Sequence, residues 1–221
     1  MFEIGQVLDD LSEFQPRYNI APTQRATVVR ALPDGTRTLA LLRWGLIPRW
    51  ARGESARKDA AKLINARAET APSKPSFRDA LHKRRCLVPA TGFYEWRPRG
   101  LGVKQPINLT PASGLFAFGG LWESWQPPEG GPPVSTFSIL TCAANDDVRS
   151  LHDRMPVLVP PAAWRAWLDP NLTELASLAA VVAPAPAGSV VLAPANPRVN
   201  SVRNEGPELL VAPRGLFPDD G

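Results

Sequence analysis

Short hydrophobic runs, many of them alternating with polar residues, recur along the whole chain. Alternation with a period of two is typical of half-buried strands, and short continuous apolar runs are typical of buried strands. The pattern predicts strands over Thr36–Trp44, Arg85–Val88, Gly92–Trp96, Ile107–Thr110, Leu115–Trp122, Ser135–Cys142, Met155–Val159 and Ser189–Leu192.

Runs with a helical pattern are fewer. They cover Glu54–Leu63, Phe77–Lys83, Ala162–Leu168 and Leu172–Ala180. We expect Ser76 to cap the second helix, with Asp79 three residues further on, and Pro160-Pro161 to precede the third.

Pro and Gly, 25 and 16 residues respectively, interrupt the chain throughout and exclude a bundle of long helices. The Pro/Gly-rich stretches Arg97–Val103 and Gln126–Pro133 are predicted loops. With 221 residues and no long linker, we expect a single domain over residues 1–221 of the α+β class, rich in strands.

No targeting or metal-binding pattern is visible. The apolar runs are too short to span a membrane, and Met1–Ile4 does not resemble a signal peptide, so we expect a soluble, cytoplasmic protein. Cys86 and Cys142 are too few for a disulfide framework and lie in no zinc-binding pattern. We therefore expect no structural metal.

The positive charge is concentrated in one part of the sequence. The net charge is +4, but the segment Arg25–Lys104 holds 18 Lys and Arg against 6 Asp and Glu. Most of the basic residues are arginine, whose planar guanidinium suits phosphate oxygens and stacks on bases. This favours a polyanionic partner, while a solvated surface of an arginine-rich protein is an equally good explanation.

Two histidines occur, and their surroundings differ. His82 lies in a predicted helix beside basic residues, where an exposed surface position is the better interpretation. His152 lies in a polar turn before an apolar strand, a common position for catalytic groups, although a structural role is more frequent for a lone turn histidine.

Polar groups also interrupt two strand-like stretches. Glu95 lies among aromatic residues, where loss of hydration would raise its pKa and make it a usable acid or base; an edge-strand glutamate facing water is the alternative. Around Ile64, alternation places Asn65, Arg67 and Glu69 on one face, which is either a functional face or the polar outer face of a half-buried strand.

Trp44 and Trp50 lie in one stretch with Arg43, Arg49 and Arg52. Aromatic rings beside phosphate-binding arginines are typical of sites that bind single strands. Core packing is the alternative for these tryptophans.

Together, several segments resemble the successive motifs of the SRAP (SOS response-associated peptidase) family, which processes abasic sites in DNA. They occur in the family's order and end near Val199-Asn200-Ser201. The motifs are Arg17–Gln24, Arg43–Pro48, Asn65–Thr70, Arg84–Trp96, Phe116–Glu123 and Leu151–Pro156.

The resemblance implies a barrel-like core of twisted mixed or antiparallel sheets with short flanking helices. It also implies a chemistry in which an N-terminal cysteine captures the aldehyde of an abasic site in single-stranded DNA: the α-amine forms a Schiff base with loss of water, and the thiol closes it to a thiazolidine. Strand-cleaving lyase and self-processing peptidase (hydrolase) activities are associated with the family. We expect a monomer that needs neither cofactor nor metal.

The resemblance further implies roles for individual residues. Asn65 would orient the linkage, and Glu95 with His152 would move protons during ring opening and Schiff-base formation. DNA binding is expected of Arg67, Trp44, Trp96, Arg49 and Arg154.

The start of the chain departs from the family pattern, because Phe2 follows Met1 and no cysteine precedes Cys86. Since Met1-Phe2 resembles the Leu-Phe end of a family helix, we expect an in-frame Met-Cys-Gly-Arg upstream in the gene. A non-covalent single-strand-binding protein without the nucleophile is the alternative. A cysteine hydrolase using Cys142 and His152 is a third hypothesis, weakened by the apolar strand around the thiol.

Overall fold

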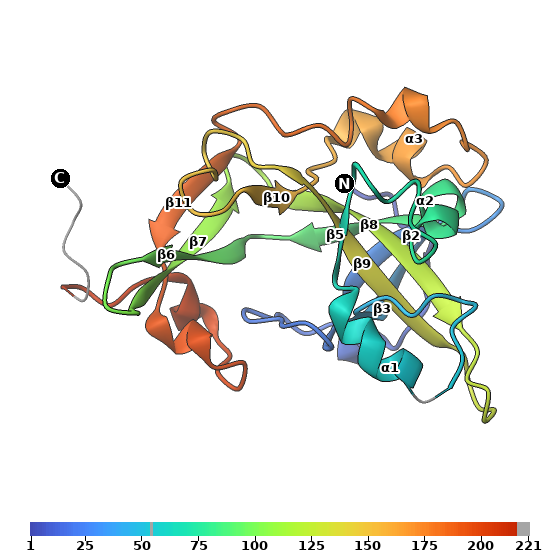
Figure 1. The fold of residues 1–221 in the computed structure, drawn as a ribbon, viewed down its shortest axis with the longest axis horizontal. Coiled ribbons are helices and arrows are strands. Elements are labelled where there is room, and N and C mark those ends of the chain that lie inside the picture. The colour runs from blue at the N-terminus through green and yellow to red at the C-terminus, as the bar shows by residue number, and fades with distance from the viewer. Residues whose placement is uncertain (54, 216–221) are drawn as a thin grey trace.

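Five strands close on themselves to form a barrel (Figure 1). The computed structural model describes residues 1–53 and 55–215. Antiparallel neighbours follow the order β3 (Arg37–Trp44), β2 (Arg25–Ala31), β5 (Arg85–Ala90), β8 (Phe116–Trp125) and β9 (Val134–Ala143). A parallel pairing of β3 with β9 completes the ring, so the barrel strands pair on both sides over part of their length.

Three short strands extend the pairing. β1 (Gln6–Val7) lies parallel to β3, β4 (Asn65–Arg67) lies parallel to β9, and β10 (Arg154–Pro156) lies antiparallel to β9. Arg67 of β4 and Pro156 of β10 are both in register with Thr141 of β9. The two polar segments singled out in the sequence therefore flank the same part of one strand.

A second sheet lies beside the barrel, toward the left of Figure 1, in the order β11 (Val190–Pro194), β7 (Lys104–Pro111) and β6 (Phe93–Pro98). β5 leads into β6 through Thr91 and Gly92. A Cβ atom at Gly92 would lie 2.8 Å from the Leu109 carbonyl oxygen, so only glycine permits this close passage. β6 thus becomes an edge strand, and it carries Glu95.

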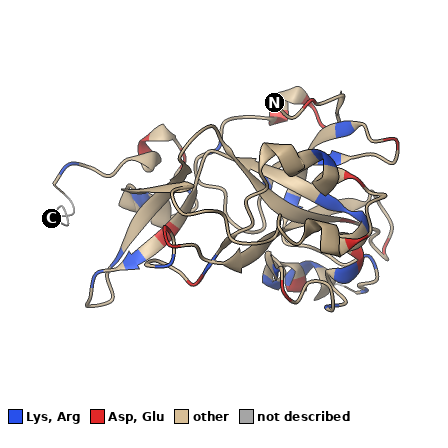
Figure 2. Cartoon of the chain, turned by 90° about the horizontal axis from the view of Figure 1, so that it is seen from above, with Lys and Arg blue, Asp and Glu red and all other residues tan. Residues whose placement is uncertain are grey.

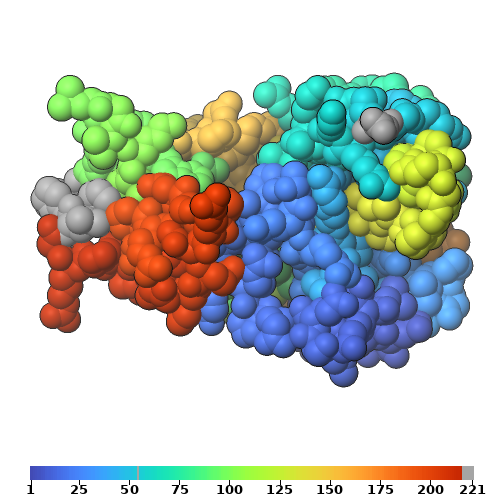
Figure 3. Space-filling view, turned by 90° about the horizontal axis from the view of Figure 1, so that it is seen from below, coloured from blue at the N-terminus to red at the C-terminus, as the bar shows by residue number. Residues whose placement is uncertain are grey.

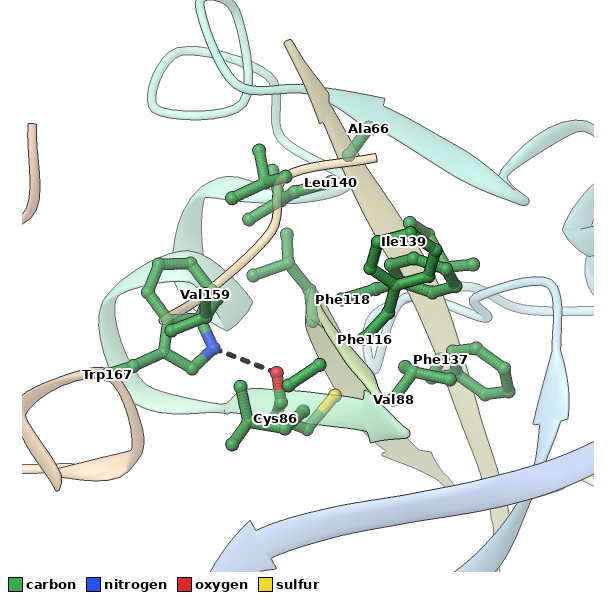
Figure 4. Close-up of a cluster of buried hydrophobic side chains, with 14 of the residues drawn as sticks. Ala66, Cys86, Val88, Phe116, Phe118, Phe137, Ile139, Leu140, Val159 and Trp167 are labelled. Atoms are coloured by element: carbon green, nitrogen blue, oxygen red, sulfur yellow. Dashed lines mark hydrogen bonds between the residues drawn. The ribbon is translucent and has the colours of Figure 1, made fainter. Parts of the chain in front are cut away.

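Side chains from the barrel strands fill the interior, as Figure 4 shows for one cluster. Phe137, Leu140 and Cys86 are almost fully buried. Trp167 closes one side, where its indole N–H donates a 2.8 Å hydrogen bond to the Cys86 carbonyl. Burial of each large apolar side chain contributes about 1.5–3 kcal/mol, which makes this core the main source of stability.

Helices are short and lie outside the barrel. The α-helices are α1 (Ser55–Asp59), α2 (Arg78–Lys83) and α3 (Trp164–Leu168). Turns of 3-10 helix occur at η1 (Leu11–Glu13), η2 (Ala60–Lys62), η3 (Pro161–Ala163), η4 (Leu175–Leu178), η5 (Pro197–Asn200) and η6 (Pro207–Leu210). No helix in the described part of the chain is long and apolar enough to cross a membrane. The α+β, β-rich fold with a barrel-like core and short helices is confirmed.

Several local predictions were wrong. β2 was not predicted, β10 begins at Arg154 and ends at Pro156, and the stretch Leu172–Ala180 forms only η4. Ser76 does not cap α2, which begins after Phe77 without a side-chain cap. Glu54, the first residue of another predicted helix, lies outside the described residues.

The missing helix has a physical cause. The Leu172 carbonyl accepts a hydrogen bond from the Arg85 guanidinium, and the Thr173 carbonyl lies 3.1 Å from His82 Nδ1. These are the first acceptors that a helix over this stretch would need. Because side chains from α2 and β5 occupy them, a tertiary contact replaces the local helix.

Candidate active site

A cleft of about 640 Å³ opens between the edge strand β6 and the turn that precedes β10. Its lining consists of Glu95, Trp96, Pro98, Gly102, Lys104, Leu151, His152 and Asn200. In Figure 3 the amber segment before β10 lies between the green β6–β7 hairpin and the teal segment around β4. Residues far apart in sequence thus meet at one surface.

Glu95 enters the cleft from β6, where it pairs with the buried Ile107 of β7. Phe93, two residues earlier on the strand, packs its ring against Phe116 and Phe118. Burial raises the pKa of the Glu95 carboxyl, and the neighbouring His152 opposes this shift. The raised pKa expected from the sequence is confirmed.

The His152 ring is oriented by its own turn. The backbone N–H of Arg154 donates a 2.9 Å hydrogen bond to His152 Nδ1, so the neutral ring carries its proton on Nε2. The Asp153 carboxylate also lies 3.1 Å from Nδ1, but its side chain is 85% exposed and water competes for it. The amide contact therefore decides the tautomer, and Nε2–H is left as a donor.

Trp96 is held at the opposite side of the cleft. Its indole N–H donates a 2.7 Å hydrogen bond to Asn200 Oδ1 of η5, which joins β6 to the C-terminal segment. Asn200, Lys104 and Leu151 were not predicted as site residues. The one signal for Asn200 was its place in the last segment of the family resemblance.

The strand β4 lies next to this region. Asn65 and Arg67 are exposed while Ala66 is fully buried, as the alternation predicted. Asn65 and Arg67 are not among the residues that line the cleft. Glu69, two residues after Arg67, accepts hydrogen bonds of 2.7 and 2.8 Å from Arg154, which lies two residues after the cleft residue His152.

Two other predicted DNA-binding residues lie elsewhere. Trp44 donates its indole N–H to the Ile64 carbonyl and stacks on Phe137, so most of its surface is committed to packing. Arg49 lines a separate depression of about 330 Å³ beside Trp50, which is 58% exposed. Of the two tryptophans in this stretch, Trp50 is the more accessible ring.

The basic segment does not form one continuous positive stripe, because acidic residues lie among its cations (Figure 2). Arg25 pairs with Asp9 and Glu13, and Arg57 pairs with Glu129. The Arg85 guanidinium is buried and donates to backbone carbonyls. Fewer cations are therefore available to a ligand than the sequence count suggests.

Neither thiol is a candidate nucleophile. Burial raises the pKa of Cys142 to about 11, and it also raises the pKa of Cys86. Both side chains are almost fully buried, so the cysteine-hydrolase hypothesis has no accessible thiolate. Among the described residues, no group of three or more His, Cys, Asp and Glu side chains could hold a metal ion.

An edge strand beside the barrel brings a half-buried carboxylate and an imidazole into one cleft. The fold and the site therefore define a β-barrel protein with a candidate acid–base site. Residues 2–202 match the model of the family described as SOS response associated peptidase (SRAP), and the chain belongs to this family. The predicted resemblance is confirmed.

Relatives support this assignment. The chain is 41% identical over 211 residues to the abasic site processing protein YoqW of Bacillus subtilis, covering 95% of this chain and 91% of that protein. It is 34% identical to the abasic site processing protein HMCES of Gallus gallus, covering 90% of this chain and 66% of that protein. A crystal structure of a Bacteroides thetaiotaomicron protein, 28% identical, matches with a TM-score of 0.77 over 86% of this chain and 82% of that one.

Proposed function

We propose that this protein processes abasic sites in single-stranded DNA, using Glu95 and His152 as an acid–base pair. The observation that carries the proposal is the meeting of these two side chains in one cleft, where His152 opposes the raised pKa that burial gives Glu95. The names of the relatives YoqW and HMCES support the choice of substrate.

The chemistry of an abasic site suits such a pair. The deoxyribose is a cyclic hemiacetal, and its aldehyde is released when the 1′-hydroxyl loses a proton and the ring oxygen gains one. Glu95, with its raised pKa, accepts the hydroxyl proton and passes it on to the ring oxygen, while His152 Nε2–H donates a hydrogen bond that stabilises the charge developing on that oxygen. Asn65 orients the opened sugar from the neighbouring strand.

The strand itself is bound by stacking and by phosphate contacts. Trp96, held by Asn200, provides a ring on which an unpaired base stacks, and the exposed Arg67 binds a backbone phosphate. Trp44, Arg49 and Arg154 were also expected to bind DNA. The packing of Trp44 and the ion pair of Arg154 favour supporting roles for these two, and Arg49 with Trp50 would extend the path of the strand.

Covalent capture of the aldehyde, with the associated lyase and peptidase activities, is the finer form of the proposal. It requires an N-terminal cysteine. A non-covalent single-strand-binding function, which needs no thiol, is the second candidate; Cys86 and Cys142 are both buried.

The test uses fluorescent single-stranded oligonucleotides with and without one abasic site. We expect tighter binding to the abasic strand and, measured with an aldehyde-reactive probe, a rise in free aldehyde if the opened sugar is not captured or a fall if it is. A band that survives denaturing electrophoresis supports covalent capture, and binding without such a band supports the second candidate. Equal binding of both strands with unchanged aldehyde would contradict the assignment.

A further inference from the structure

Glu69 lies between the two cations of the site, and the chemistry above gives it no task. Its carboxylate accepts two parallel hydrogen bonds from Arg154, a bidentate geometry that fixes the planes of both groups. Arg154 is mostly buried, with 19% of its side chain exposed, whereas 53% of the Glu69 side chain is exposed. The arginine is thus the held partner, and Glu69 holds it from the solvent side.

The pair also ties two strands to one carbonyl. The Thr141 carbonyl oxygen accepts a 2.5 Å hydrogen bond from Arg154 Nη2 and a 2.9 Å hydrogen bond from the backbone N–H of Ala68. Ala68 directly precedes Glu69, and Arg154 begins β10. The end of β4 and the start of β10 are therefore fixed on opposite sides of β9.

Arg154 connects these contacts to the His152 imidazole. Its guanidinium is held by Glu69 and Thr141, and its backbone N–H is the donor to His152 Nδ1. Holding the side chain restricts rotation of the peptide group that selects the His152 tautomer. Loss of the carboxylate would leave the guanidinium with only its Thr141 contacts and loosen that amide.

Charge gives Glu69 a second effect. The Arg154 guanidinium, and to a smaller extent the Arg67 guanidinium, lowers the pKa of Glu69, so its carboxylate stays ionised at neutral pH. It neutralises Arg154 and leaves Arg67 as the exposed cation beside it. A phosphate is then directed to Arg67 rather than to the pair.

We propose that Glu69 is a positioning residue, which acts through Arg154 to hold His152 in the Nε2–H tautomer and reserves Arg67 for a DNA phosphate. This deepens the proposed function and, for its effect on DNA, rests on it.

The first test needs no DNA. Side-chain ¹⁵N NMR of the full chain, at a pH of about 8, reports the tautomer of each ring. His82 is the internal control, because its Nδ1 faces the Thr173 carbonyl at 3.1 Å and must carry the proton. We expect Glu69→Gln to convert His152 from a single Nε2–H form to a mixture while His82 stays unchanged. An unchanged His152, or a change at both rings, overturns the positioning role.

The second test separates rate from binding. Glu69→Gln should slow abasic-site processing at least about tenfold, because a misplaced hydrogen-bond donor is costly, while single-strand affinity stays equal or rises because Arg154 loses its carboxylate partner. Glu69→Asp, which keeps the charge, should recover part of the rate. The matched control is Glu129→Gln, which removes an exposed carboxylate paired with Arg57.

An unchanged rate, or parallel losses of rate and affinity, overturns the inference. If the unaltered protein does not process abasic DNA, the proposed function fails, and the NMR measurement still decides the role of Glu69.

Discussion

The properties of single residues at this site follow from what each side chain contacts. Glu95 gains a raised pKa from burial on an edge strand, and His152 gains a fixed tautomer from one backbone amide. Glu69 shows the opposite behaviour to Glu95, because the Arg154 guanidinium lowers its pKa. Two glutamates of one site therefore have different charges over an intermediate pH range.

The raised pKa of Glu95 predicts the pH dependence of processing. The carboxylate must be ionised to accept a proton, so the rate should rise with pH above the ordinary glutamate pKa of about 4.3. Glu95→Gln should remove this rise and lower the rate by about 10²–10⁴-fold. A pH–rate profile under single-turnover conditions measures both effects. If Glu95→Gln keeps the same rise of the rate with pH, that rise belongs to another ionisable group.

The contribution of Glu95 to folding stability should fall as pH rises, whereas the processing rate rises. A carboxyl with a raised pKa in the folded state binds protons more tightly than it does in the unfolded chain. Its contribution to stability is therefore lost as pH rises through the interval between the two pKa values. Glu95→Gln should unfold at a higher denaturant concentration than the unaltered protein at pH 7. A lower midpoint would show that the carboxylate stabilises the fold.

Glu69 should make the fold acid-sensitive. Its pKa is lowered on folding, so its contribution is present above about pH 4.3 and is lost as pH falls through the folded-state pKa. The effect should stay below about 1 kcal/mol because 53% of the side chain is exposed. Denaturant unfolding at several values between about pH 3 and about pH 7 measures this effect. The free energy of unfolding should depend less on pH in Glu69→Gln than in the unaltered protein.

At the scale of elements, a few tertiary contacts place the short strands and turns. Gly92 lets the chain pass from the barrel into β6, and the Thr141 carbonyl anchors both β4 and β10. The Arg85 guanidinium binds the carbonyls of Trp167, Asp169 and Leu172. One buried side chain thus fixes the end of α3 and the irregular chain that follows.

Arg85 should accordingly be essential to folding. Arg85→Met keeps the length and apolar stem of the side chain but leaves several carbonyls without their donor, each at a cost of about 1–3 kcal/mol. We expect a loss of at least about 3 kcal/mol in the free energy of unfolding, measured with denaturant. Arg165→Met, on an exposed position of the neighbouring α3, is the control. Similar small losses in both variants would contradict this role.

At the scale of the whole molecule, local patterns predicted the β-rich class because barrel strands alternate strongly in sequence. They singled out Glu95 because a carboxylate lies there among aromatic residues, and His152 because it lies in a polar turn before an apolar strand. They predicted too long a helix over Leu172–Ala180 and missed Asn200 and the Glu69–Arg154 pair, since these features depend on contacts across 85 or more residues. The sequence count also overstated the number of cations available to a ligand, because Arg25 and Arg57 are neutralised by carboxylates outside the basic segment.

Binding across the molecule should depend on salt. Counterion release gives a log–log slope of about −0.7 for each phosphate contacted on a single strand. Arg67→Ala should flatten this slope, whereas Trp96→Ala should cost about 1–3 kcal/mol of binding with little change in slope. Titration of a fluorescent oligonucleotide at several salt concentrations distinguishes the two. Affinity that is independent of salt, or indifferent to both changes, would remove the DNA assignment from this surface.

The central claim is that Glu95 and His152 act together on one abasic sugar. The most direct measurement is a double-mutant cycle on the single-turnover rate of abasic-site processing, using Glu95→Gln, His152→Gln and the double variant. Groups that act as one unit are not additive, so we predict that the double variant is about as slow as the slower single variant. Losses that multiply, or single variants that keep the full rate, would contradict the shared site.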